Sequence, residues 1–294
     1  MARKNIFQLV EENYDVQSEI EKIDRLFTNE PYFEINYICP LSFKKIVKSY
    51  LFHDWKYRGT CISVEEYFER AEADLSVSSI VSEECIINYL EIMENFVKLY
   101  MSNADFLQIE KGVGCDNKFI TVYYDLIRTL EKRMGLTTRE YKDRIIIYPK
   151  NAPLEQVVDL CEDEDVQWEL IRYVREDLSL TEKRKSLAYL ATNLYIEYDK
   201  TETNVHLKEL LNKAENILNN LHIRHNNKTG KWENEIIETI DEKDTLSLCD
   251  MVYNEMLTIV LLREHKKYDP IYAEFNTKQK ATRTKKKAED EDNG

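Results

Sequence analysis

Glycine and proline are scarce in this sequence, with 6 and 5 among 294 residues. An all-β protein needs many turns, and turns favour these two residues, so the scarcity argues against an all-β fold. It also argues against phosphate-binding loops built on glycine. The segment Lys111-Gly112-Val113-Gly114 has two glycines, but no strand is expected before it. We expect that segment to form a turn between two helices.

Motifs for metal and nucleophile chemistry are also absent. The five histidines, at positions 53, 206, 222, 225 and 265, include no pair at the i, i+4 spacing, and the six cysteines form no Cys-x-x-Cys pair. No nucleophile elbow occurs. The acidic run Glu162–Asp165 is expected to begin a helix, because adjacent carboxylates point in different directions. We therefore expect no metal site and no cofactor.

Long apolar runs are missing as well. Residues 1–7 lack the apolar core of a signal peptide, and no stretch approaches the ~20 apolar residues of a membrane span. The scattered cysteines suit a reducing compartment, so we expect a cytoplasmic protein that does not contact a membrane. The net charge of −14 argues against broad, non-specific nucleic-acid binding, although a local basic site is compatible with it.

Helical periodicity is present in nearly every segment, and 43% of the residues are hydrophobic. We expect an all-α fold, made of one or more multi-helix bundles, with one short extended segment near residues 144–148. The strongest helix is expected over 83–109, where Phe96 lies in the densest apolar stripe. Other helices are expected over 5–27, 41–53, 117–134, 154–161, 164–177, 181–198, 203–221 and 245–267.

Helix caps and prolines indicate how the chain is divided. Polar side chains are expected to cap the helices that follow them, at Ser63, Thr181, Thr203 and Asp244. Pro149 and Pro153 predict a boundary between an N-terminal helical region, residues 1–148, and a C-terminal helical domain, residues 149–276. The charged tail, residues 277–294, has almost no apolar side chains and is expected to be disordered.

One polar segment, residues 222–228, follows the helix expected over 203–221. Its side chains can donate protons or bind a phosphate: His222, Arg224, His225, Asn226, Asn227 and Lys228. Neighbouring side chains on a helix diverge by about 100°, so Arg224 and His225 can meet one ligand only if the chain turns. Asn226, Asn227 and Gly230 favour such a turn. The same residue types also cap the carbonyls of a helix end, which is the structural alternative.

The C-terminal half resembles a group of uncharacterised bacterial proteins associated with abortive infection, which are HEPN-like and helical. The resemblance lies in Ile223-Arg224-His225-Asn226-Asn227 with Asp250, Tyr253 and Leu257 on the next helix, and in residues 147–151 through Leu178 and Lys185. HEPN proteins are small helical bundles, often dimers, and many are metal-independent ribonucleases used in phage defence. Their motif places a His several residues after an Arg, whereas here His225 follows Arg224 directly.

This resemblance implies a bacterial, defence-associated protein that binds or cleaves RNA. Arg224 would hold the scissile phosphate and His225 would act as general base or acid, so these two are the candidate catalytic residues. His222, Asn226, Asn227 and Lys228 are the candidate RNA-binding residues. A second copy of the chain or another defence protein is a possible partner. The alternative is a non-catalytic helical scaffold or regulatory module for protein interactions.

Overall fold

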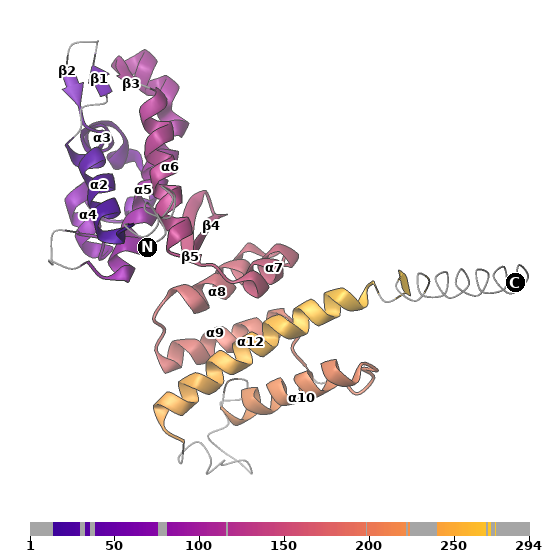
Figure 1. Cartoon of the computed structure of the whole chain (residues 1–294). Coiled ribbons are helices and arrows are strands. Elements are labelled where there is room, and N and C mark those ends of the chain that lie inside the picture. Colours follow the sequence, from indigo (N-terminus) through magenta and orange to yellow (C-terminus); the bar gives the residue numbers. More distant parts are fainter. Residues whose placement is uncertain are drawn as a thin grey trace, which may run out of the picture. The chain divides into compact units, whose positions relative to one another are not determined.

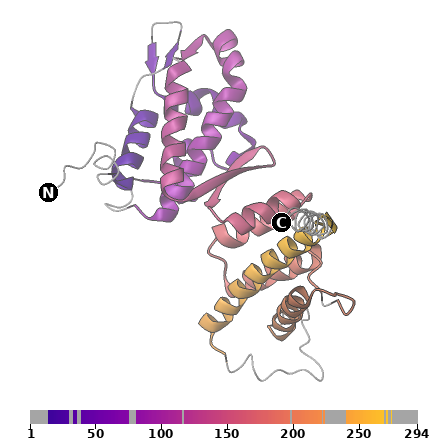
Figure 2. The ribbon, with the colours of Figure 1, turned by 45° about the vertical axis from the view of Figure 1, so that its right-hand side comes forward.

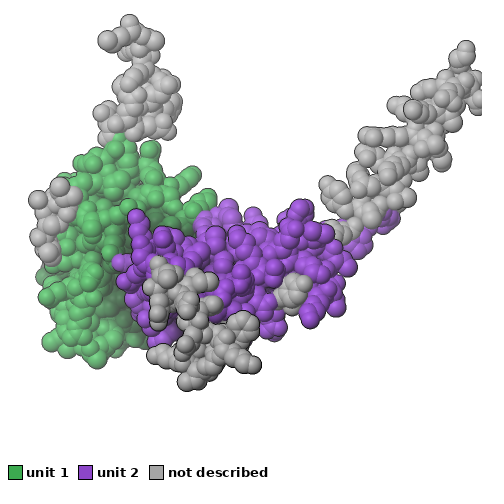
Figure 3. Space-filling view, turned by 90° about the horizontal axis from the view of Figure 1, so that it is seen from below, with its two compact units in different colours: residues 1–150 green, residues 151–294 purple. Residues whose placement is uncertain are grey.

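The fold is known from a computed structural model, which describes residues 14–29, 33–35, 39–75, 81–115, 117–197, 199–221, 223, 240–268, 270, 271 and 274. The chain divides into two compact units, Met1–Lys150 and Asn151–Gly294, coloured separately in Figure 3. The sequence placed a boundary after residue 148. The tail expected to be disordered lies outside the described residues.

Unit 1 is built around two long helices, α5 (Glu83–Lys111) and α6 (Asn117–Arg133), which lie side by side (Figures 1 and 2). α2 (Val16–Thr28) packs on α6, and α4 (Val64–Arg70) follows later in the chain. Between them, α3 (Phe43–Ile46) continues into the π-helical turn η1 (Val47–Leu51) and the 3-10 turns η2 (Phe52–Asp54) and η3 (Lys56–Arg58). The expectation of a mostly helical fold is confirmed.

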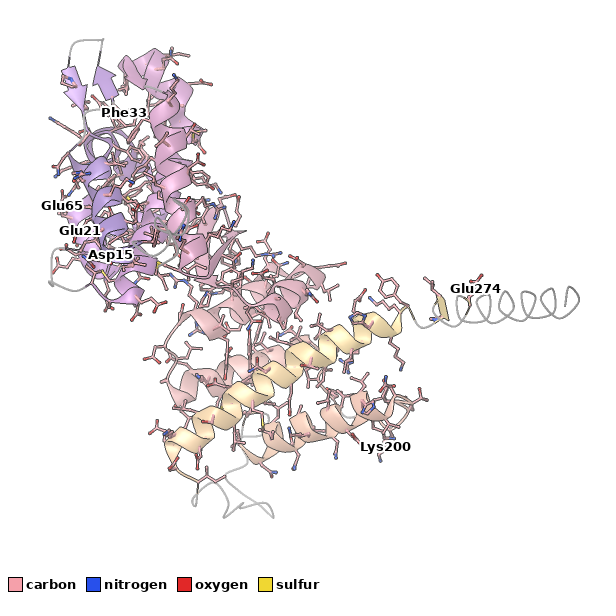
Figure 4. The ribbon with its side chains drawn as sticks, in the orientation of Figure 1. Asp15, Glu21, Phe33, Glu65, Lys200 and Glu274 are labelled. Atoms are coloured by element: carbon pink, nitrogen blue, oxygen red, sulfur yellow. The ribbon has the colours of Figure 1, made fainter. Side chains whose placement is uncertain are left out.

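Aromatic rings fill the core of this unit. Phe96 on α5 is fully buried, as its apolar stripe predicted, and its ring lies 6.0 Å from that of Phe27 and 5.2 Å from that of Trp55. Phe33, labelled in Figure 4, contacts the rings of Phe43, Tyr100 and Phe119. Edge-to-face and stacked contacts of this kind add to the free energy gained by burial.

The sequence missed most of the strands. β5 (Arg144–Pro149) is the expected extended segment, but it pairs with β4 (Leu136–Tyr141) in an antiparallel hairpin that packs on α5 and α6. Three further strands form a sheet in the order β2-β1-β3: β1 (Phe33–Ile35), β2 (Cys39–Leu41) and β3 (Val113–Cys115). The turn expected at residues 111–114 is therefore partly wrong. Gly112 ends α5 with φ of 61°, and Val113 begins β3.

Unit 2 contains five long described helices: α7 (Ala152–Leu160), α8 (Glu164–Arg175), α9 (Leu180–Asn193), α10 (Val205–Asn220) and α12 (Glu242–Lys266). α12 packs against α7, α9 and α10. Among the described residues, α12 is the one helix that is long and apolar enough to cross a membrane, judged by length and composition alone. Its side chains Cys249, Val252 and Met256 are nevertheless fully buried inside the unit, and the core helix of a globular domain meets the same criterion.

Three expected helix caps of unit 2 were wrong. Ser179 caps α9 in a capping box with Glu182, in place of Thr181. Asn204 caps α10 in place of Thr203, and Asp241 caps α12 in place of Asp244. In each case a second suitable side chain stands within three residues, and the residue that caps the helix is the earlier one, except at α10, where it is the next one. The cap expected at Ser63 is confirmed: its side chain caps α4, and the Glu66 carboxylate accepts from the Ile62 N–H.

Candidate functional site

The segment that the sequence singled out lies between α10 and α12. His222, Arg224, His225, Asn226, Asn227 and Lys228 all lie outside the described residues. The two described residues that flank position 222 are buried, Leu221 with 3% and Ile223 with 7% of its surface exposed. The Ile223 N–H also donates to the Leu218 carbonyl at 3.0 Å. Arg224 therefore follows a residue that is anchored in the core of unit 2.

The far side of the segment is anchored by α12. Lys266, near the end of α12, pairs with Glu202, just before α10, at 2.6 Å. Lys213 on α10 pairs with Glu255 on α12. These ion pairs require α10 and α12 to run antiparallel, as Figures 1 and 2 show, so the end of α10 and the start of α12 lie at the same end of the unit. Residues 224–239 thus connect two fixed helix ends.

Asp250 and Tyr253, on which the resemblance partly rests, hold the helices of unit 2 together. Asp250 Oδ1 accepts from the Tyr173 hydroxyl at 3.0 Å and from Lys183 Nζ at 2.5 Å. The rings of Tyr173 and Tyr253 stack with their centroids 4.2 Å apart, and the Tyr253 hydroxyl donates to the Leu170 carbonyl. Burial, and then the charge of Asp250, raise the pKa of Tyr173 far above its ordinary value. These groups join α8, α9 and α12.

Unit 1 contains a buried carboxyl pair that the sequence analysis missed. Glu94 on α5 and Glu131 on α6 are 0% and 2% exposed. Arg128 reaches both, with its Nε 3.1 Å from Glu94 Oε1 and its Nη1 3.2 Å from Glu131 Oε2. The Arg128 guanidinium also donates to the Thr138 hydroxyl on β4. The available signal was a glutamate inside the most apolar stripe of the chain, where an ionisable side chain is rarely placed without a partner.

The pKa values of both carboxyls are raised above the ordinary value of a glutamate. Burial, followed by the nearby charge of Glu94, raises the pKa of Glu131 to about 8. Burial raises the pKa of Glu94 to about 6, against the opposing effect of Arg128. The raised pKa values belong to the pair as a whole: burial favours the protonated carboxyls, and the Arg128 guanidinium favours the charged ones. Carboxyl pairs of this type serve as acid and base in many enzymes. Neither of these two, however, lines the cavities of about 290, 400 and 530 Å³ formed by described residues.

Neighbouring polar contacts attach the β4–β5 hairpin to α5. The Asn95 amide accepts from the Ile145 N–H at 2.9 Å and donates to its carbonyl at 2.8 Å. Glu91 accepts from the Ile147 N–H at 2.8 Å. Glu91, Glu94 and Asn95 all lie on α5. Glu91 and Asn95 bond to the backbone of β5 at Ile147 and Ile145, and Glu94 pairs with the guanidinium of Arg128. The arrangement is structural: it joins a hairpin to two helices.

Among the described residues, no group of three or more His, Cys, Asp or Glu side chains is placed to hold a metal ion. The acidic run at 162–165 begins a helix, as expected. Asp163 caps α8 by accepting from the N–H groups of Asp165 and Val166. A scan against protein-family models and searches among curated proteins and solved structures found no match to this chain.

Proposed function

We propose that this chain is a HEPN-like, defence-associated protein that binds RNA through the segment between α10 and α12. Arg224 contacts the scissile phosphate, and His225 moves the proton in cleavage. His222, Asn226, Asn227 and Lys228 contribute contacts to the RNA backbone. The guanidinium offers two parallel donors to phosphate oxygens, and an imidazole titrates close to neutral pH.

The observation that supports this proposal is the anchoring of the segment at both ends. Leu221 and Ile223 are buried, and the cap residue Asp241 fixes the start of α12. Binding and catalytic residues are often carried by loops that a rigid scaffold positions. The segment between α10 and α12 is polar, contains two His and an Arg, and connects two packed antiparallel helices.

A cleavage assay tests the proposal directly. Full-length protein is incubated with end-labelled single-stranded RNA, and the products are resolved on a gel, with and without a chelator. We expect cleavage that a chelator leaves unchanged. His225→Ala should lower the rate 10²–10⁴-fold, the usual loss for a general acid or base, while the melting temperature stays unchanged. Arg224→Lys keeps the charge but loses the fork, so it should weaken cleavage as well.

The alternative function is a protein-interaction module, and two observations favour it. Three apolar side chains are exposed along the last turns of α5: Met101 at 61%, Phe106 at 46% and Ile109 at 77%. The first turn of α12 carries Glu242 and Asp244 beside the cap Asp241, and this acidic end repels phosphate. In this case the wild-type protein neither cleaves nor binds RNA. It then self-associates through α5, and Ile109→Asp shifts it from dimer to monomer in sedimentation.

A further inference from the structure

A row of alternating cationic and aromatic side chains lies in unit 1, on η3 and on the tip of the β4–β5 hairpin. The two strands of this hairpin are labelled in Figure 1. Lys56 Nζ lies 4.9 Å from the centroid of the Tyr57 ring. The Arg144 guanidinium lies 5.8 Å from the Tyr57 ring and 5.5 Å from the Tyr141 ring. Lys142 Nζ lies 4.9 Å from the Tyr141 ring. We call these five side chains the cation–aromatic row.

The backbone that presents the row is unusual. Lys142 and Asp143 form the two-residue turn between β4 and β5, and both have positive φ, 47° and 67°. Turns of this kind favour Asn-Gly, because other side chains are strained there. Asp143 in this turn pairs with Lys56 on η3 at 2.7 Å, and both side chains are exposed. The turn therefore projects its charged side chains into solvent beside η3.

The charge around the row is positive although the chain as a whole is strongly acidic. Two of the nearby carboxylates already hold a lysine: Asp143 pairs with Lys56, and Glu140 pairs with Lys98 at 2.6 Å. Five cations, Lys56, Arg58, Lys98, Lys142 and Arg144, and three carboxylates, Asp54, Glu140 and Asp143, belong to the row, to η3 or to the lining of the adjoining hollow, which is an excess of two positive charges. The local field at a surface, and not the net charge, decides which ligands it attracts.

A hollow of about 400 Å³ adjoins the row. It shares Lys56 and Tyr57 with the row, and its wall includes the mostly buried ring of Trp55. Ser102 adds a hydroxyl to the lining, and Asp54, Glu140 and Asp143 add carboxylates. The Asn95 amide is already bonded to the Ile145 backbone, and Lys98 is paired with Glu140. The hollow therefore combines aromatic surface with hydrogen-bond acceptors, which suit the amino and imino donors of a planar heterocycle.

We propose that this surface of unit 1 binds single-stranded RNA. Bases stack on Tyr57 and Tyr141, phosphates pair with Lys142 and Arg144, and one base enters the hollow beside Trp55. The contact between the exposed Lys142 and the Tyr141 ring is weak, so an incoming base displaces the Lys142 ammonium group, which then pairs with the phosphate. A paired base cannot stack on a side chain in this way, which is why the ligand is single-stranded. The proposal shares its ligand class with the proposed function but none of its residues.

Salt-dependent binding of the full-length protein to a labelled single-stranded oligouridylate tests the proposal. For single strands, the slope of log affinity against log salt is about −0.7 for each phosphate contact. Lys142→Gln with Arg144→Gln should therefore make the slope less negative by about 1.4. Tyr141→Ala should weaken binding at least about fivefold, the lower limit for one lost stacking contact, with little change in slope. Lys132→Gln, an exposed change on α6 that removes one positive charge away from the row, is the control and should change neither quantity.

The outcomes separate the two RNA proposals. If substitutions at Arg224 and His225 abolish cleavage, and substitutions in the row still weaken the binding of single-stranded RNA, both surfaces contact RNA. If the row variants bind as the wild type does, with the same slope, the row is not an RNA surface, whatever residues 222–228 do. Binding of duplex RNA as tight as single-stranded RNA, with Tyr141→Ala unchanged, would overturn the stacking. Arg144→Lys keeps the positive charge, so it should bind RNA with the wild-type slope of log affinity against log salt. That result would exclude a folding defect as the cause of the change in the Arg144→Gln variant.

Discussion

The two units stabilise themselves with different side chains. Unit 1 has a core of aromatic rings and buries ionisable groups, with Glu94 and Glu131 shielded from solvent around Arg128. Unit 2 is packed with aliphatic side chains, and Phe275 is the single phenylalanine after Lys150 in the sequence. Its carboxyls with shifted pKa values have lowered ones: Glu182, Asp199 and Glu202. Unit 1 also has carboxyls with lowered pKa values, Asp15, Glu65 and Asp143. The comparison therefore predicts that both units weaken toward acid pH, and that the buried pair makes unit 1 alone lose stability between about pH 4.5 and pH 8.

The sign for each unit follows from the direction of its shifts. A carboxyl whose pKa is raised in the folded state keeps a proton that the unfolded chain would release, so stability falls as the pH rises. Unit 1 should therefore weaken between about pH 4.5 and pH 8, the ordinary and the raised pKa of Glu131. A carboxyl whose pKa is lowered contributes stability above its ordinary pKa and loses it on acidification. Unit 2 should weaken slightly toward acid pH.

The largest expected effect comes from the aromatic core. Phe96→Ala removes a fully buried ring that contacts Phe27, Trp55 and Phe68, and should cost about 3–5 kcal/mol through the cavity it leaves. Leu190→Ala on α9 is the matched change in unit 2 and should cost about 2–5 kcal/mol. Hydrogen exchange read residue by residue should show the larger loss of protection in the unit that carries each change. Equal losses in both units would contradict two separate cores.

A smaller effect, on the order of 2 kcal/mol, is expected from Glu131→Gln at alkaline pH. The amide cannot ionise, so the variant should be more stable than the wild type at pH 9 and no more stable at pH 5. Urea unfolding at a series of pH values measures this difference. Glu140→Gln, an exposed carboxyl on β4, is the control and should follow the wild type. A stability of unit 1 that rises toward pH 9 would show that the buried pair is not protonated.

The Asp250 contact in unit 2 should matter less, because its side chain is 51% exposed. Asp250→Asn weakens the bonds from Tyr173 and Lys183 and should cost about 1 kcal/mol, since hydrogen bonds to charged groups are worth more than neutral ones. The loss of amide protection should appear in α8, α9 and α12. An unchanged denaturation midpoint would mean that solvent screens this contact completely.

The smallest expected effect is a gain. Tyr195 follows α9 with φ of 54°, its side chain is 77% exposed, and Arg263 donates to its carbonyl. Glycine adopts this conformation without strain, so Tyr195→Gly should stabilise unit 2 by about 0.5–1 kcal/mol. Tyr189→Gly, an exposed tyrosine inside α9, should instead destabilise it. A loss of stability in Tyr195→Gly would show that the ring contributes packing.

The sequence predicted the helices well, because their apolar stripes repeat over many residues. It missed the strands β1, β2 and β3, which are three residues long and too short for a periodic signal. β4 was missed because its sequence, Leu-Thr-Thr-Arg-Glu-Tyr, is mostly polar and pairs only through tertiary contacts. The Glu94–Glu131 pair joins residues from two helices, and no local pattern in the chain brings them together.

The two candidate RNA surfaces also differ in whether the sequence alone reveals them. His222 to Lys228 was visible because its polar residues are adjacent in the sequence. The cation–aromatic row was not visible, because Tyr57 and Lys56 are brought to Tyr141, Lys142 and Arg144 only by folding. Spacing along the chain therefore reveals sites built on one segment and misses sites assembled from two.

Photo-crosslinking of single-stranded RNA to the full-length protein, followed by peptide mapping, tests the central claim most directly. RNA carrying 4-thiouridine is irradiated with the protein, and the crosslinked peptides are identified by mass spectrometry. The account predicts crosslinks in two places, at residues 222–228 and at Tyr57 or Tyr141. The absence of any crosslink, or crosslinks confined to other parts of the chain such as the lysine-rich residues 285–287, would contradict it.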